Sequence, residues 1–133
     1  MAGCYTFSCD HCGFSVDSWE DGNRYLEWPI GTRNYLYHPS DIDETERLMR
    51  EIYGHSPTPD EYMTAFRRYR GNETEFLCCG CLAISRIDEK RDLRVCSSCK
   101  SAALREIGNR LAATECPKCR QGHFDAGKMT GVS

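Results

Sequence analysis

The apolar positions of the chain change their period twice, from a strand-like alternation to helical spacing and back. Residues 5–20 place strand-forming side chains on both sides of Cys9 and Cys12, which predicts a strand, a tight turn and a second strand. Residues 25–37 are rich in aromatic side chains but are interrupted by Pro29 and a glycine, so we expect short extended pieces there.

Two helices are predicted in the middle of the chain. The first begins after Ser40 as its N-cap, carries acidic residues in its first turn and ends at Gly54. The second begins after Thr58, where a proline at the first helical position and Glu61 complete a capping-box pattern, and it ends at Gly71. Each helix has one apolar face, which we expect to pack against the core of the protein.

The pattern returns to strands in the C-terminal half. Residues 75–77 and 82–87 are expected to form strands, and the charged run 88–92 a hairpin loop. Apolar residues at helical spacing in 101–113 predict a third helix, although a glycine weakens it. Residues 128–133 are expected to form a disordered tail.

Composition indicates that apolar burial alone would give this chain a thin core. Hydrophobic residues make up 40% of the 133 residues, and the mean hydropathy is -0.60. Ten cysteines supply another means of stabilisation. Eight of them form four Cys-x-x-Cys pairs, which are Cys9/Cys12, Cys78/Cys81, Cys96/Cys99 and Cys116/Cys119.

The spacing within these pairs favours metal binding over disulfide bonds. A disulfide within Cys-x-x-Cys closes a very short loop, so it removes little entropy from the unfolded chain. Two residues between the thiolates instead let the backbone fold into a knuckle that directs both sulfurs at one ion, and two knuckles complete a tetrahedral shell. The four pairs therefore predict two structural Zn²⁺ ions.

The sequence shows no sign of export or membrane insertion. The N-terminal residues lack the basic and apolar regions of a secretory signal, and no stretch approaches the roughly 20 apolar residues of a membrane span. Paired thiols in such a chain fit a reducing compartment. We therefore expect a cytoplasmic protein that does not associate with membranes.

The knuckle sequences resemble those of the zinc-ribbon and treble-clef superfamily. Cys9-Asp-His-Cys-Gly-Phe and Cys116-Pro-Lys-Cys-x-x-Gly carry this resemblance, which covers the four knuckles and their flanking strands, about half of the chain. The overall layout is similar to that of a group of small uncharacterised prokaryotic proteins with several zinc knuckles. Cys81 departs from the pattern, because Leu82 follows it in place of a glycine.

The resemblance implies a small, metal-stabilised α+β fold, with two zinc-ribbon-like or treble-clef-like β units and short helices inserted. We expect residues 1–133 to form a single compact two-zinc domain. Its parts are an N-terminal knuckle and β segment (1–39), a helical insert (40–71), a C-terminal knuckle cluster (72–127) and the tail (128–133).

Three pairings of the knuckles remain open. Sequential pairing, which we prefer, joins the first knuckle to the second and the third to the fourth, and makes two zinc ribbons. Nested pairing joins the second and third across 82–95, read as a β-hairpin, and a helix after Cys99 would make this unit a treble clef. A cross-brace is the third possibility. The same eight cysteines are the ligands in each case.

Two cysteines and two histidines lie close to this framework without being predicted ligands. Cys79 could replace Cys78, but the single residue that would then separate the two ligands of that knuckle would strain a shared site. Cys4 is expected to be a small buried apolar residue of the first strand. His11 and His123 could be spare ligands, but we expect them beside the ligands or at the surface, because structural zinc sites are closed at four ligands.

The sequence does not predict an enzyme. A catalytic zinc needs an open coordination position, and eight cysteines that divide into two closed shells leave none. The four histidines are scattered, and no deaminase-type or His-Glu-x-x-His motif is present.

Charge argues against nucleic acid as the main partner. Residues 1–81 carry 7 basic and 14 acidic side chains, and residues 82–133 carry 10 and 6. Each Zn–Cys₄ site adds about two negative charges, because four thiolates outweigh one divalent ion, and the sum repels a polyanion. The alternative function, a nucleic-acid-binding zinc ribbon, would use the basic C-terminal half through Arg86, Lys90, Arg91, Arg94, Lys118 and Arg120.

A protein-binding role fits the sequence better. Residues 24–37 combine aromatic and arginine side chains without a clear period, which is typical of interfaces, although the same residues would also suit a cover for a small core. We therefore predict a zinc-binding, non-enzymatic adapter or regulatory module that binds another protein through a metal-stabilised surface.

Overall fold

The computed structural model describes residues 2–132, and the chain divides into two compact units. Unit 1 consists of Met1–Gly22 and Glu73–Ser133, and unit 2 is the segment Asn23–Asn72 between them. The expected boundary between 39 and 40 differs from this division, because Leu26 and Leu36 pack in one cluster with side chains of both helices. That the whole chain is a single domain stays a prediction.

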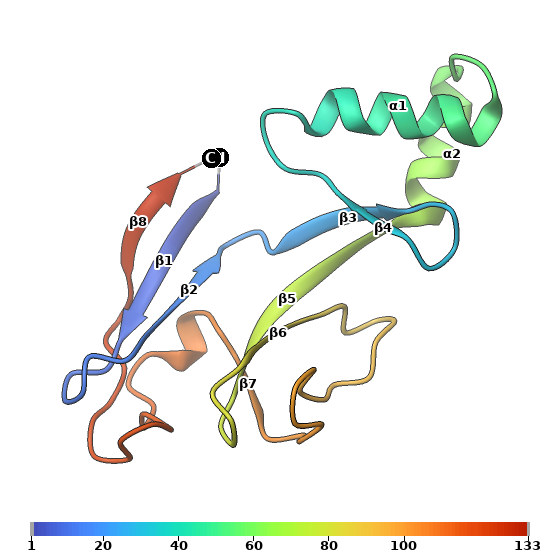
Figure 1. Ribbon diagram of the computed structural model, residues 1–133. Helices are drawn as coiled ribbons and strands as arrows, with labels where there is room; N and C mark the ends of the chain where they lie inside the picture. The colour runs from blue at the N-terminus through green and yellow to red at the C-terminus, as the bar shows by residue number, and fades with distance from the viewer. Residues whose placement is uncertain (1, 133) are drawn as a thin grey trace. The chain divides into compact units, whose positions relative to one another are not determined.

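Unit 1 contains a three-stranded antiparallel sheet of order β2-β1-β8 (Figure 1). Its strands are β1 (Gly3–Ser8), β2 (Ser15–Trp19) and β8 (Lys128–Val132). β1 and β2 are the strands predicted around the first knuckle. β8 pairs with the other edge of β1, so the expectation of a disordered tail is wrong for residues 128–132; Ser133 lies outside the described residues.

β5 (Arg70–Cys78) begins in unit 2 and ends in unit 1, where two further strands pair with it. β6 (Ile84–Ile87) and β7 (Leu104–Glu106) both pair with β5 in antiparallel fashion. The strand order of this second sheet is β4-β3-β5-β6, with β7 also paired to β5. The strands predicted at 75–77 and 82–87 are confirmed, the second as the shorter β6.

The predicted helix over 101–113 is wrong. The segment contains β7 and, after Gly108, a short 3₁₀ turn η1 (Asn109–Leu111). Leu104, Ile107 and Leu111 are buried, so a strand followed by a turn satisfies the apolar spacing that suggested a helix. Pairing with β5 outweighs the weak helix propensity of a segment that contains a glycine.

Two apolar clusters form the core of unit 1. The first consists of Phe7, Val16, Leu77, Ile107, Leu111 and Phe124. The second consists of Phe76, Cys78, Ile87, Cys96 and Leu104. Because the second cluster includes two knuckle cysteines, the apolar core and the knuckles of unit 1 are continuous.

Unit 2 has its own core and contains no cysteine. The hairpin of β3 (Asn23–Glu27) and β4 (Arg33–Tyr35) is followed by α1 (Asp41–Tyr53) and α2 (Pro59–Tyr69), coloured teal to green in Figure 1. Its buried core residues are Leu26, Leu36, Leu48, Met49 and Ala65. Within residues 2–132, neither helix has the length and apolar character that crossing a bilayer requires.

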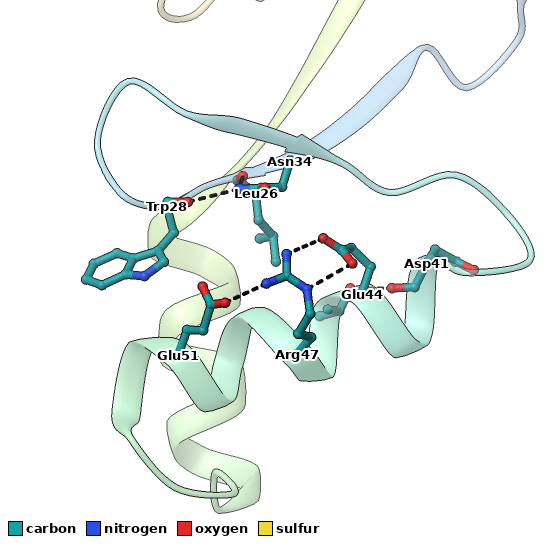
Figure 2. A network of polar contacts seen from close by, with 8 residues as sticks. Leu26, Trp28, Asn34, Asp41, Glu44, Arg47 and Glu51 are labelled. Carbon is teal, nitrogen blue, oxygen red and sulfur yellow. Dashed lines mark hydrogen bonds and ion pairs between the residues drawn. The ribbon is translucent and has the colours of Figure 1, made fainter.

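The loop between β3 and β4 is held by a side-chain amide. Asn34 donates hydrogen bonds from Nδ2 to the carbonyl oxygens of Leu26, at 3.4 Å, and Trp28, at 2.9 Å (Figure 2). The N–H of Trp28 in turn donates to the carbonyl of Thr32, at 3.0 Å. The backbone position from which the Trp28 side chain projects is therefore fixed.

The N-cap side chains of the two helices make different hydrogen bonds. Thr58 Oγ1 accepts a hydrogen bond from the Glu61 N–H, at 3.2 Å, and the Glu61 carboxylate accepts one from the Thr58 N–H, at 3.0 Å, so the predicted capping box is confirmed. Ser40 occupies the N-cap position of α1, but its hydroxyl donates to the Tyr37 carbonyl and makes no cap bond.

This difference predicts different costs of removing the two hydroxyl groups. We expect Thr58→Ala to lower the free energy of unfolding by about 1 kcal/mol, the usual cost of losing an N-cap side chain. Ser40→Ala should lower it by less than half of that. Denaturant unfolding followed by circular dichroism at a helical wavelength measures both values, and equal losses would contradict the assignment of the caps.

Candidate metal centres

The eight paired cysteines come together as two groups of four. Site A contains Cys9, Cys12, Cys116 and Cys119, and site B contains Cys78, Cys81, Cys96 and Cys99. Within each site the Sγ atoms all lie within 4.8 Å of one another. This is the nested pairing, so the preferred sequential pairing and the cross-brace are wrong. The hairpin expected across 82–95 is also wrong, because β6 pairs with β5.

The separations between sulfur atoms fit a tetrahedral metal ion. In site A, the Sγ atoms of Cys9 and Cys119 are 3.7 Å apart, and those of Cys12 and Cys116 are 3.8 Å apart. The corresponding distances in site B are 3.6 Å and 3.5 Å. A tetrahedral shell with metal–sulfur bonds of about 2.3 Å places its sulfurs about 3.8 Å apart, whereas a disulfide needs about 2.05 Å. Both groups can therefore hold a metal ion.

All four knuckles are built from the same backbone turn. In each, the carbonyl of the first cysteine accepts a hydrogen bond from the residue four positions later. That later residue has a positive φ in every case: 76° at Gly13, 68° at Leu82, 64° at Lys100 and 57° at Arg120. Leu82, which departs from the knuckle pattern in sequence, thus adopts the same conformation as Gly13.

Backbone N–H groups of the turns point at sulfur atoms and favour their ionised form. The N–H of Cys99 is the main influence that lowers the pKa of Cys96, to about 6. The N–H groups of Gln121 and Gly122 lower the pKa of Cys119, also to about 6. Each site therefore has at least one sulfur whose ionised form is favoured without help from a metal.

A second sulfur in each site has a raised pKa. The N–H of Phe14 lowers the pKa of Cys12, but desolvation and the neighbouring sulfurs outweigh it and raise the pKa to about 11. The N–H of Ala83 likewise lowers the pKa of Cys81, but the Cys96 sulfur and desolvation raise it to about 12. Four adjacent thiolates repel one another, so a divalent cation is the partner that lets all four ionise together.

Site A is assembled by direct docking of the first knuckle on the fourth. The N–H of Asp10 donates to the His123 carbonyl, at 3.0 Å, and the His123 N–H donates to Asp10 Oδ1, at 2.9 Å. Cys9 also forms a β-bridge with Phe124. A Cβ atom on Gly122 would lie 2.5 Å from the Cys9 sulfur, so the approach of the two knuckles requires a glycine at this position.

Site B is assembled from a shorter stretch of chain. The Ser97 N–H donates to Ser85 Oγ, at 3.0 Å, which ties the third knuckle to β6. Cys78 and Cys96 are buried, whereas Cys81 and Cys99 are exposed. In site A only Cys12 is exposed, and Cys119 is half-buried. Site B therefore has two exposed cysteines, whereas site A has one.

The remaining cysteines and histidines take no part in either group. Cys79 is half-buried, and its N–H donates to the Ala103 carbonyl, so Cys78 and not Cys79 joins site B. Cys4 lies on β1 opposite Trp19. It is half-buried, whereas the sequence predicted a buried residue. His11 and His123 are exposed beside site A, as predicted.

The basic residues that the sequence suggested for nucleic acid have varied surroundings. The Arg94 guanidinium lies 4.8 Å from the centroid of the Phe76 ring, and the Lys118 ammonium lies 5.7 Å from that of Phe14. Arg120 occupies the positive-φ position of the fourth knuckle. The other three predicted residues, Arg86, Lys90 and Arg91, lie on β6 and in the turn after it, close in sequence to the acidic residues 88, 89 and 92.

Sequence reasoning missed the residues that decide which knuckles meet. Asp10 and Gly122 join the first knuckle to the fourth, and Ser85 joins β6 to the third. The glycine three positions after Cys119 was visible as part of the knuckle motif, but its contact with the Cys9 sulfur was not. Serine and aspartate at such positions give no separate signal, because their partners lie far away in the sequence.

No protein-family model, no curated protein and no solved structure matches this chain. The chemistry of the two sites therefore follows from their geometry, which is that of two four-sulfur metal centres.

The contact at Gly122 predicts that site A is sensitive to a single added methyl group. Gly122→Ala should weaken metal binding at site A by at least about fivefold, because the new Cβ overlaps the Cys9 sulfur and overpacking costs roughly 1–3 kcal/mol. Competition with a chromogenic chelator measures the affinity.

Gly108→Ala is the matched control for this substitution. Gly108 has an extended φ of 176°, and no atom lies within 4 Å of its added Cβ. It should keep the parental affinity at both sites. If both variants bind metal like the parent, the close approach at Gly122 is not required for site A.

The larger number of exposed cysteines in site B predicts that this site releases its metal first. A chelator in excess should extract two ions per chain in two phases, with the fast phase from site B. Cys99→Ser should lose the fast phase and keep the slow one, while Cys79→Ser should keep both phases. A fast phase that persists in Cys99→Ser would show that the assignment is reversed.

Proposed function

We propose that this chain is a zinc-stabilised, non-enzymatic adapter that binds another protein. The observation that carries the proposal is the division of tasks between the units. All eight cysteines of sites A and B belong to unit 1, whereas unit 2 contains no cysteine and has its own apolar core. Unit 2 supplies no ligand to either metal centre, and a role in recognition explains its presence.

Zinc is the proposed ion at both sites. Four sulfur ligands in tetrahedral geometry select zinc or iron, and closed four-cysteine shells are typical of structural zinc. The four chain sulfurs would fill the coordination shell, which leaves no position for a substrate or a reactive water. A reducing compartment such as the cytoplasm would keep these thiols available for the metal.

Protein is the proposed partner because of what unit 2 exposes. Ile30 is 89% exposed, Ile42 66% and Tyr37 51%. The Tyr37 ring stacks on Tyr35 with 5.8 Å between centroids. Arginine and aromatic side chains are also exposed or half-buried at the end of α2. This mixture of apolar, aromatic and arginine side chains is enriched at protein–protein interfaces.

Nucleic acid is the less well supported partner. Arg94 and Lys118 lie over aromatic rings of unit 1, and two zinc tetrathiolates would add about four negative charges to the same unit. A polyanion would meet this repulsion before any local contact could form.

Isolation of the partner tests the proposal. The tagged, full-length chain is purified from the cells that produce it, one half of the sample with nuclease treatment and one half without. Both halves are analysed for metal and for bound protein, and the untreated half also for nucleic acid. We expect two zinc ions per chain and one identified protein that forms a complex again from purified components. Recovery of nucleic acid alone, or of a chain that binds no protein, would contradict the adapter function; iron or a single ion would contradict the metal assignment.

A further inference from the structure

An aromatic and arginine surface lies where the β3–β4 loop of unit 2 meets the end of α2. The Trp28 ring packs edge-on against Tyr69, with 5.3 Å between centroids. The Arg68 guanidinium lies 5.4 Å from the centroid of the same Tyr69 ring. Trp28 and Tyr69 are half-buried and Arg68 is exposed, so this group forms part of the surface of the unit.

Two neighbours extend this surface in different ways. Ile30 follows Trp28 in the β3–β4 loop and is 89% exposed, which adds an apolar contact. Arg67 precedes Arg68 on α2 and is also exposed, which places a second positive charge on the same turn of the helix. We call Trp28, Ile30, Arg67, Arg68 and Tyr69 the loop–helix surface.

The loop–helix surface is basic within an acidic protein. Between Glu61 and Glu73 the chain carries three arginines and no acidic residue. Among the described residues, neither Arg67 nor Arg68 forms an ion pair, in contrast to Arg47, which pairs with two glutamates on α1 (Figure 2). The formal net charge of the whole chain is -3 before any zinc tetrathiolate is counted. The surface is therefore complementary to a negatively charged ligand.

We propose that the loop–helix surface binds an acidic segment of the partner protein, with carboxylates on Arg67 and Arg68 and an apolar side chain against Trp28 and Ile30. This inference rests on the adapter function proposed above and names its binding surface. A guanidinium accepts a carboxylate in a bidentate pair, and one that already lies over a ring loses less freedom when it binds. The fixed Trp28 backbone reduces the cost of ordering in the same way.

A short acidic peptide suits the surface better than a nucleic acid does. A nucleic acid carries charge along its whole length and meets the negative charge of the rest of the chain. A peptide segment places a few carboxylates at the surface, and its apolar side chain uses Ile30, whose exposure adds nothing to phosphate binding. The two ligands are therefore distinguishable by experiment.

The test uses the full-length, zinc-loaded chain and defined probes in fluorescence anisotropy near physiological salt. The first probe is a labelled twelve-residue peptide with six glutamates and two leucines; the others replace glutamate by glutamine, replace leucine by serine, or are a twelve-nucleotide oligothymidine. We expect the acidic, leucine-containing peptide to bind at least about tenfold more tightly than each of the other three. Binding by the glutamine peptide with equal affinity, or tighter binding by oligothymidine, would overturn the proposal.

Variants locate the binding surface. The double substitution Arg67→Ser with Arg68→Ser should weaken binding of the acidic peptide at least about tenfold, and Trp28→Ala should weaken it several-fold. Arg110→Ser with Lys128→Ser, which changes the net charge equally in unit 1, should leave the affinity unchanged, and circular dichroism checks that each variant is folded. Equal losses in both double variants would show a general charge effect and overturn the assigned surface.

Binding of the natural partner to the parent chain and to the double variant tests the proposed surface and the adapter function separately. If the identified partner still binds the Arg67 and Arg68 double variant as it binds the parent, the loop–helix surface is wrong but the adapter function stands. If the parent chain binds no protein, the adapter function itself fails. Loss of partner binding in the double variant alone supports both.

Discussion

The repulsion between four thiolates is the constraint on which the rest of unit 1 depends. Within each site the sulfurs lie within 4.8 Å of one another, and the pKa values of two of them diverge, to about 6 at Cys96 and about 12 at Cys81. Without a cation, protonation of some of the sulfurs relieves this repulsion, and it breaks the symmetry of the shell. A bound divalent ion would remove that conflict, so metal binding would favour the convergence of the knuckles.

The two sites constrain the chain to different extents. Cys9 and Cys119 are 110 positions apart, whereas Cys78 and Cys99 are 21 apart. Closing the longer loop costs about 1.5 kcal/mol more in chain entropy if the intervening segment is unfolded. Site A has additional contacts that offset this cost, namely the hydrogen bonds between Asp10 and His123 and the pairing of β8 with β1. Site B needs fewer of them, and its local closure favours its formation before site A.

The sequence predicted what local chemistry determines and missed what distant contacts determine. The four Cys-x-x-Cys pairs identified all eight sulfurs, and Thr58 with Glu61 identified a helix start, because each signal lies within four residues. The pairing of knuckles depends on Asp10 meeting His123, which no local pattern encodes. The apolar spacing of 101–113 predicts a helix, but residues 104–106 of this segment pair with β5 as a strand. The positive φ of Leu82 could not be predicted from its residue type either, because the turn of the knuckle imposes it against the preference of leucine.

Unit 2 is stabilised differently, because it contains no cysteine and supplies no ligand to either metal centre. A segment of this size buries a small core, and such cores give marginal stability. Its capping box, the ion pairs of Arg47 and the Asn34 bonds are the local contacts that compensate. A partner that binds the folded unit adds stability through mass action. Under the proposed function, folding of unit 2 would be coupled to the concentration of the partner, whereas folding of unit 1 would be coupled to the metal ion that its sulfurs hold.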